Sequence, residues 1–357
     1  MARVVAIVLA VVAAAAALLV APAAAELTRV EHLPKTEGAL NILAVGDWGR
    51  RGQYNQTLVS EQMGLVGEKL DIDFVISTGD NIYDDGIANT SDPLFKECFT
   101  NIYTAQSLQK PWYIVLGNHD YTGNALAQQD PAIREVDSRY LSIAKSFIVN
   151  SEIDELHDNF VCIFVVHRKE IADFFLVDTS PFYLKYWNSS KTLTTRWRNL
   201  WLPGRLSSAT TPSAAPASMG TLPSSSSCFD QSSRHCRVIL SSLLVDSSSK
   251  MNSESDLFRH GNATQARGAD MYVNGHDHCL QHISSRNSPV QFMTSGGGSK
   301  AWAGKFKTTS DKIEFIYDGQ GFMSMQLSKT EAHLVFYDVA GNVLHTYDST
   351  KTEDDEH

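Results

Sequence analysis

Four short polar clusters contain side chains that could bind metal ions or transfer a proton. Each cluster begins with glycine, and carboxylates, an amide or imidazoles follow it. Such groups are ligands of hard-to-borderline cations such as iron, zinc and manganese. The candidate residues are Asp47, Asp80, Tyr83, Asn118, His119, His276 and His278.

The candidate set is large enough for two metal ions. A carboxylate such as Asp80 can bridge two cations with its two oxygens. His276 and His278 are separated by one residue, so both rings point to the same side of an extended segment. Two cations about 3.5–4 Å apart can hold a phosphate group and activate water for in-line attack. The residues therefore predict a dinuclear centre suited to phosphoryl transfer.

Each cluster taken alone has a simpler explanation. A single Asp after a strand is usually a turn or cap residue, and the Gly-Asp pair is common by chance. The four clusters, however, occur in order along the chain, and each follows a short apolar run. The joint pattern is what favours a functional site.

Five apolar runs, each ended by polar residues, are typical of buried strands. Polar residues at successive strand ends indicate an α/β sheet that collects a site along one edge. Between the first two runs, residues 58–70 are predicted to be helical, with apolar side chains at Leu58, Met63, Val66 and Leu70. The five runs are Asn41–Val45, Phe74–Ile76, Trp112–Leu116, Phe174–Val177 and Met271–Val273.

The C-terminal part has a different pattern. Residues 321–327 and 332–337 are predicted strands, and the Gly341-Asn342 turn leads into a third, which together indicate an antiparallel meander. The fold class that we expect is α/β, an α+β sandwich of two mixed β-sheets flanked by helices, with a βαβαβ core. We expect residues 38–348 to form a single domain, followed by an acidic tail at 349–357.

Residues 192–267 do not fit this pattern. From Ser207 to Ser255, 17 of 49 residues are serine and none is Trp or Tyr, so the stretch has little apolar surface to bury. Structureless stretches longer than ~15 residues are rare inside compact domains. We expect a segment that is disordered or that results from a frame shift or mis-splicing.

Together, the four clusters resemble the metallophosphoesterase signature, and in detail the small, low-molecular-weight purple acid phosphatases of plants and animals. Tyr83, in Gly79-Asp80-Asn81-Ile82-Tyr83, is the discriminating residue, because most other metallophosphoesterases lack it. The resemblance covers roughly residues 38–200 and 268–348. It implies a metallophosphoesterase-like fold and an acid phosphatase that hydrolyses small phosphate monoesters.

The resemblance also implies the metals and the roles of the candidate residues. One site would hold Fe(III) and the other a divalent ion, either iron, zinc or manganese, with Asp80 as the bridge. A metal-bound hydroxide would be the nucleophile. His119 would contact the phosphate and could protonate the leaving group. The ferric ligands would be Asp47, Tyr83 and His278, and those of the divalent ion Asn118 and His276.

One signature block of the family, Gly-His-His, has no counterpart in this chain. Its second histidine resembles a ligand of the divalent metal, and its expected place falls within residues 192–267. His235 is the one candidate near that spacing, but it precedes apolar residues rather than following them. The ferric half of the centre is therefore predicted to be complete, and the divalent half to lack one ligand.

A second departure from the family lies at residues 153–170. The family runs almost directly from a strand like Ser146–Val149 to one like residues 171–175, whereas this chain has an extra stretch that includes Phe160–His167. Retained intron sequence would explain the insertion. A genuine extra strand is the alternative.

The N-terminus and composition indicate a secretory route. Arg3, an apolar run to Val20 and small residues up to Ala25 predict a signal peptide over residues 1–25, with an uncleaved signal anchor as the alternative. We therefore expect no stable membrane anchor and a secreted protein (extracellular, cell wall or vacuole). Four glycosylation sequons agree with this route, at Asn55, Asn89, Asn188 and Asn262.

Cysteine count and charge exclude other classes. Five cysteines without a Cys-x-x-Cys pair argue against a zinc ribbon and allow at most two disulfides. The net charge of -10 argues against non-specific nucleic-acid binding. Three functions stay open: a Fe(III)–M(II) phosphomonoesterase, a phosphodiesterase or nucleotidase on the same scaffold, and a metal-poor, inactive variant. The sequence does not indicate an oligomeric state.

Overall fold

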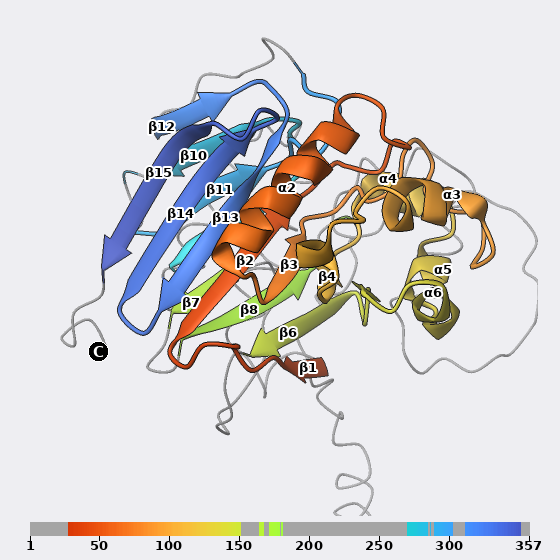
Figure 1. Cartoon of the computed structure of the whole chain (residues 1–357), viewed down its shortest axis with the longest axis horizontal. Coiled ribbons are helices and arrows are strands. Elements are labelled where there is room, and N and C mark those ends of the chain that lie inside the picture. Colours follow the sequence, from red (N-terminus) through yellow and green to blue (C-terminus); the bar gives the residue numbers. More distant parts are fainter. Residues whose placement is uncertain are drawn as a thin grey trace, which may run out of the picture.

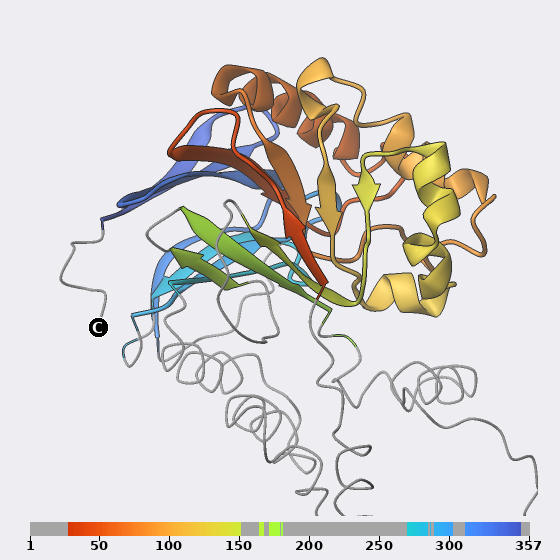
Figure 2. The ribbon, with the colours of Figure 1, turned by 90° about the horizontal axis from the view of Figure 1, so that it is seen from below.

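Two mixed β-sheets pack face to face in the computed structural model, which describes residues 28–150, 164–167, 171–178, 180, 270–284, 286, 289–302 and 311–350. Figure 2 shows the two sheets edge-on as separate layers, with the helices beyond one of them. The predicted class, two mixed sheets flanked by helices, is confirmed.

The first sheet has the strand order β15-β14-β13-β2-β3-β4-β5 in the described part of the chain. Strands β2 to β5 are parallel to one another, and β13 to β15 add an antiparallel edge. The bounds are β2 (Ala39–Val45), β3 (Phe74–Ser77), β4 (Trp112–Ile114), β5 (Tyr140–Leu141), β13 (Gly321–Ser328), β14 (Glu331–Asp338) and β15 (Val343–Thr350).

The second sheet has the order β1-β6-β8-β7-β9-β11-β10-β12 over the same described residues. Most of its pairs are antiparallel, while β1 pairs in parallel with β6 and β9 with β11. The bounds are β1 (Thr28–Glu31), β6 (Ser146–Asn150), β7 (Phe164–His167), β8 (Ala172–Val177), β9 (Met271–Asn274), β10 (Leu280–Ser284), β11 (Gln291–Ser295) and β12 (Lys312–Tyr317).

Helices cover the outer face of the first sheet. Figure 1 shows α2 lying across β2 and β13, with the shorter helices beside β3 and β4. The bounds are α2 (Gln56–Leu70), α3 (Pro93–Phe95), α4 (Asn118–Thr122), α5 (Ala125–Gln129) and α6 (Pro131–Val136), with a π-helical turn at Lys96–Thr100 and a 3₁₀ turn at Gln106–Leu108.

Two apolar cores hold the layers together. The core between the sheets combines Phe74 and Phe336 of the first sheet with Phe174 and Met293 of the second. The other core lies between the first sheet and its helices and is rich in aromatic rings, including Trp48. A fully buried side chain of this size contributes about 1.5–3 kcal/mol, so these cores fix the relative position of the strand ends.

The predicted elements of the first sheet and its meander are confirmed, with small differences. β4 ends at Ile114, two residues before the predicted Leu116. The predicted helix begins at Gln56, and Leu58 is 42% exposed, whereas Met63 is fully buried. Gln56 is buried because its amide oxygen accepts from the backbone of Arg50 and Gly52 and its amide nitrogen donates to the Cys98 carbonyl.

The extra stretch at 153–170 contains a strand. Residues 164–167 form β7, which pairs with both β8 and β9, so the alternative of a genuine extra strand holds for these four residues. The predicted signal peptide and the segment 192–267 with His235 lie outside the described residues. Of the acidic tail predicted at 349–357, the first two residues end β15, and residues 351–357 lie outside the described residues. None of the described helices is both long and apolar enough to cross a membrane.

A pair of histidines joins the two sheets. The Nδ1 atom of His282 on β10 lies 3.0 Å from Nε2 of His345 on β15, and Nε2 of His282 lies 2.9 Å from Oε1 of Gln291. Because that oxygen can only accept, His282 carries its proton on Nε2 and accepts a hydrogen bond from His345. If both rings gained a proton, both nitrogens of this hydrogen bond would be donors, and the bond would be lost.

Burial lowers the pKa of both rings. The charged groups around the pair are on β12, where Glu314 raises both pKa values and Lys312 lowers that of His282. Since the unfolded chain binds more protons than the folded one, stability from this pair is present above about pH 6.5 and is lost as the pH falls.

We predict that His345→Gln, which keeps a hydrogen-bond donor but cannot titrate, makes the loss of stability from pH 7 to pH 5 shallower. The difference should approach about 1.4 kcal/mol per pH unit for each excluded proton. Chemical denaturation at several pH values measures it. His333→Gln on the neighbouring strand β14, where His333 pairs with Asp348, is the control. Identical pH slopes for His345→Gln and the native chain would contradict the prediction.

Candidate metal centre

The predicted site residues come from segments that follow strands of both sheets. Asp47 and Asp80 follow the parallel strands β2 and β3, and Asn118 begins α4 after β4. His276 follows β9 of the other sheet, and its backbone N–H donates to Asp47 Oδ2 at 2.8 Å. This bond ties the two sheets together at the site, as do those between Gly46 and the 295–298 segment.

Three of the candidate residues have left-handed backbones, which are uncommon for residues other than glycine. The φ angles are 60° at Asp47, 48° at Asp80 and 72° at His276. Aspartate and histidine adopt this region more readily than most residues, and such backbones concentrate at functional sites. Each turn directs its side chain back across the end of its sheet toward the others.

The phenol oxygen of Tyr83 lies at the point where the other side chains converge. It is 2.8 Å from Asp47 Oδ1, 3.3 Å from Asp80 Oδ2 and 3.0 Å from His278 Nε2. These four residues are 5% exposed or less. Oxygen and nitrogen donors gathered so closely, with water excluded, form a set that fits a metal cation.

The backbone fixes the orientation of His278. Its Nδ1 atom donates to the carbonyl oxygen of Lys300, which leaves the Nε2 lone pair facing Tyr83 and Asp47. The Trp302 ring stacks on the imidazole with 4.3 Å between centroids and 9° between planes. Metal-binding histidines usually donate their second N–H to such an acceptor.

The other side of the centre is more open. The His276 side chain is 58% exposed, and its Nδ1 atom is 3.8 Å from Asp80 Oδ2. Asn118 is half-buried beside the same carboxylate, since the next backbone N–H, that of His119, donates to Asp80 Oδ1 at 2.8 Å. Asp80 therefore lies beside both groups of candidate ligands: Oδ2 is close to Tyr83 and His276, and Oδ1 accepts from the backbone next to Asn118.

His119 lies beside the cluster, in contact with its edge. Its ring centroid is 4.3 Å from that of Tyr83, and Nδ1 lies 2.6 Å from the Asp84 carbonyl oxygen. Because this oxygen can only accept, the proton is on Nδ1 and Nε2 is free to exchange a proton elsewhere. The Arg50 guanidinium pairs with Asp84 and lies 3.7 Å from the Tyr83 ring centroid, which holds both in place.

The pKa shifts reflect concentrated negative charge. Burial, followed by the charges of Asp47 and Asp80, raises the pKa of Tyr83 well above its ordinary value. Burial also raises the pKa of Asp47, with the charge of Asp80 adding to it. Burial opposes ionisation of Asp80 too, but the nearby His276 ring and the hydrogen bond from the His119 backbone lower its pKa overall. Asp80 in turn raises the pKa of His276.

Six of the seven candidates are thus shown to contact one another, and Asn118 adjoins them. Counting only His, Cys, Asp and Glu, the described residues form no group of three placed to hold an ion. The donors converge only when the Tyr83 phenol is included. The sequence did not single out Arg50, Trp302 or Asp120, although Asp120 stands inside the third motif, beside His119.

Comparison with known proteins agrees with this geometry. Residues 40–280 match the family model for calcineurin-like phosphoesterases. Purple acid phosphatase 4 of Arabidopsis thaliana is 43% identical over 341 residues, covering 92% of this chain and 89% of the relative. Purple acid phosphatase 3 of the same plant is 45% identical over 92% of this chain and 82% of its own length. The chain belongs to the purple acid phosphatases. It is a metal-dependent phosphatase that hydrolyses phosphate esters.

More distant similarities extend beyond the plant phosphatases. Human tartrate-resistant acid phosphatase type 5 is 26% identical over 86% of the chain and 89% of its own length. Among solved structures, GAP50, described as the anchor in the inner membrane complex of Plasmodium, superposes with a TM-score of 0.60 at 18% identity, covering 89% of this chain and 90% of its own. This second likeness concerns the fold alone.

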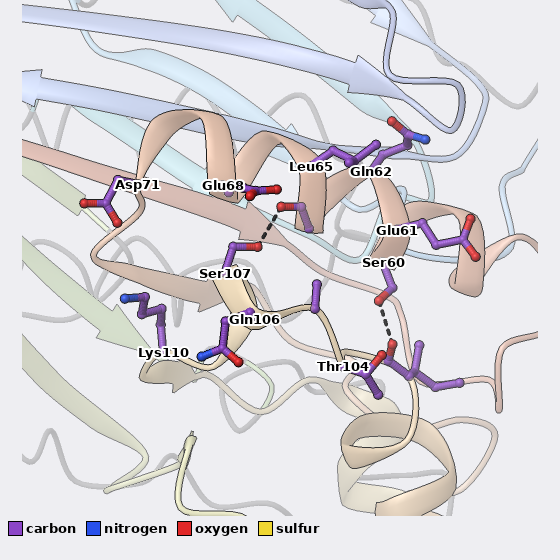
Figure 3. A pocket seen from close by; sticks show the side chains of 14 residues that line it. Ser60, Glu61, Gln62, Leu65, Glu68, Asp71, Thr104, Gln106, Ser107 and Lys110 are labelled. Atoms are coloured by element: carbon purple, nitrogen blue, oxygen red, sulfur yellow. Dashed lines mark hydrogen bonds between the residues drawn. The ribbon is translucent and has the colours of Figure 1, made fainter.

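A groove on the phosphatase surface lies apart from the centre. It has a volume of about 600 Å³ between α2 and the 102–110 segment, and none of the candidate ligands lines it. Figure 3 shows Ser60 and Ser107 among the residues that line the groove. Their hydroxyl groups donate hydrogen bonds to the carbonyl oxygens of Ile102 and Gly64, respectively. The chemistry-bearing side chains are therefore not in this groove.

The left-handed turn before Asp80 gives a direct test of the strand ends. Gly79 has φ 104°, and a Cβ there would lie 3.2 Å from the Gly117 Cα atom. We predict that Gly79→Ala lowers the unfolding free energy by roughly 1–3 kcal/mol and impairs phosphatase activity. Gly38→Ala is the matched control, because Gly38 has φ 75° with nothing within 4 Å of its Cβ position. Thermal melts and assays that show equal effects of both changes would refute the role of this contact.

Proposed function

We propose that this phosphatase is a secreted enzyme that hydrolyses phosphate monoesters with a dinuclear Fe(III)–M(II) centre. The observation that carries the proposal is the convergence of Asp47, Asp80 and His278 on the Tyr83 phenol oxygen. The family name shared by its relatives supports an acid phosphatase. In this proposal Fe(III) is held by Asp47, Tyr83 and His278, the divalent ion (iron, zinc or manganese) by Asn118 and His276, and Asp80 bridges them.

The charge of the site supports two cations. Asp47 and Asp80 are buried carboxylates within reach of one phenol, and neither has a Lys or Arg partner among the described residues. Uncompensated buried carboxylates are costly, so a cation at this point offsets their desolvation. Bound metal ions would supply Lewis acidity toward the phosphate and lower the pKa of a nearby water.

The residues of this chain have separate tasks in the reaction. Asp47 and Tyr83 are buried and hold the inner side of the site dry, whereas the exposed side chain of His276 marks the side open to substrate. His119 donates its Nδ1 proton to the Asp84 carbonyl, so its Nε2 can take up a proton from solvent and pass it to the leaving group. Arg50 keeps Asp84 in place by its ion pair.

Secretion is part of the proposal and is supported by the leader-like residues 1–25. Two of the sequons, Asn55 and Asn89, are exposed and thus accessible to glycosylation. Cys98 and Cys279 are buried free thiols, so at most one disulfide can form among the three cysteines outside the described residues. Glycosidase treatment of protein collected from the medium tests both secretion and glycosylation.

Tyr83→Phe tests the ferric site. A phenolate bound to Fe(III) absorbs visible light, so we predict that the iron-loaded native protein is coloured and that Tyr83→Phe loses the visible band. Absorption spectra of matched, iron-loaded samples measure it. Tyr54→Phe is the control, because Tyr54 also contacts Arg50 but is half-exposed and donates to none of the candidate ligands. A colourless native protein that cleaves phosphodiesters better than p-nitrophenyl phosphate would favour the phosphodiesterase alternative.

The metal-poor alternative has its own test. Because the Gly-His-His block is missing, we predict that the purified chain retains close to one iron but less than one divalent ion. It should also hydrolyse p-nitrophenyl phosphate more slowly than a version with that block restored. Elemental analysis and steady-state kinetics on the two proteins measure this. Equal metal content and equal activity would show that the missing histidine is not needed.

A further inference from the structure

A buried carboxylate outside the candidate ligand set lies directly behind the centre. Asp120 is the third residue of α4, two positions after Asn118, and is fully buried. Its side chain touches none of the candidate ligand atoms. A buried charge without a Lys or Arg partner is costly unless hydrogen bonds satisfy it.

Five hydrogen bonds satisfy this carboxylate. Oδ2 accepts from the backbone N–H of Asn81 at 3.0 Å, from its side-chain amide at 2.9 Å and from the Gly117 N–H at 2.9 Å. Oδ1 accepts from the Ile82 N–H at 3.2 Å and from the Gln128 side chain at 2.9 Å. Hydrogen bonds to a charged acceptor are about twice as strong as neutral ones.

Four of the five hydrogen bonds come from the two loops that carry the centre. Asn81 and Ile82 are the residues between Asp80 and Tyr83, and Gly117 immediately precedes Asn118. One carboxylate therefore sets the spacing between the β3 loop and the start of α4. We propose that Asp120 is a positioning residue that holds Asp80, Tyr83 and Asn118 in register with one another.

Buried hydrogen bonds extend the support beyond Asp120. The Asn81 amide also donates to the Val115 carbonyl at 2.8 Å, and its oxygen accepts from Ser77. On the other side, the Tyr140 hydroxyl of β5 donates to Gln128 Oε1 at 2.6 Å. Residues of β3 and β5 and the residue after β4 therefore stabilise the Asp120 network, and none of them is a candidate metal ligand.

Only an acceptor-only group of this size fits five donors. An asparagine at position 120 would place an NH₂ group against N–H donors and leave buried donors unsatisfied. Residues that orient ligands in this way typically change metal affinity or activity by about 10–100-fold when replaced. We expect Asp120→Asn to lower kcat and iron affinity by about that factor.

The test separates positioning from general stability. Asp73→Asn is the matched control, because Asp73 is also buried and accepts two backbone N–H bonds, from Lys35 and Asn41, at the opposite end of β2 and β3. Hydrogen–deuterium exchange of the metal-free proteins should show the amides of Asn81, Ile82 and Gly117 exchanging at least about tenfold faster in Asp120→Asn only. In the iron-loaded protein, the visible band should shift in Asp120→Asn and not in Asp73→Asn.

The outcomes distinguish this inference from the proposed function, on which the colour and iron-affinity measurements rest, whereas the exchange measurement does not. A native protein without a visible band would overturn the ferric site while leaving the exchange measurement decisive for Asp120. Unchanged exchange at the three amides, or equal losses of activity and stability in both variants, would overturn the positioning role. If Asp120→Asn does not fold, Gln128→Met removes a single donor, and a normal exchange rate and kcat in that variant would count against the proposal.

Discussion

Two carboxylates, Asp47 and Asp80, are buried beside one another at the ends of adjacent parallel strands, and this concentration of negative charge constrains the rest of the structure. A core that surrounds such groups must satisfy every oxygen. Backbone N–H groups of His276 and His119 and the phenol of Tyr83 provide those contacts. The turns, the glycines beside them and the aromatic packing behind them are arranged so that these donors reach the carboxylates.

The same contacts explain why the two sheets meet at this point. The inter-sheet core fixes the strand directions, but it is non-directional and would tolerate small shifts. Hydrogen bonds between the 46–47 turn, His276 and the 295–298 segment define the register at the strand ends. Asp120 provides the corresponding register within the first sheet. The site is thus held by directional bonds, and the layers beneath it by burial.

Much of this could be predicted from local patterns. Apolar runs ended by Gly-Asp, Gly-Asn or Gly-His identified β2, β3, β4 and β9, because parallel strands place their ends at one edge. Long-range pairing was not predictable: nothing near residues 164–167 indicates that they lie between β8 and β9. Arg50 and Trp302 were missed because their roles depend on rings that are distant in sequence. Asp120 was missed because its partners are mainly backbone amides, which leave no sequence signature.

The left-handed backbones at Asp47, Asp80 and His276 limit which residues can occupy these positions. Asparagine, aspartate and glycine adopt this conformation at low cost, whereas β-branched residues are strained there. A reference form of the protein that lacks these ligands, needed as a blank for metal titrations, is therefore best made with glycine at these positions. Valine or threonine would distort the backbone turn, so a loss of metal binding in such a variant could not be assigned to the missing ligand.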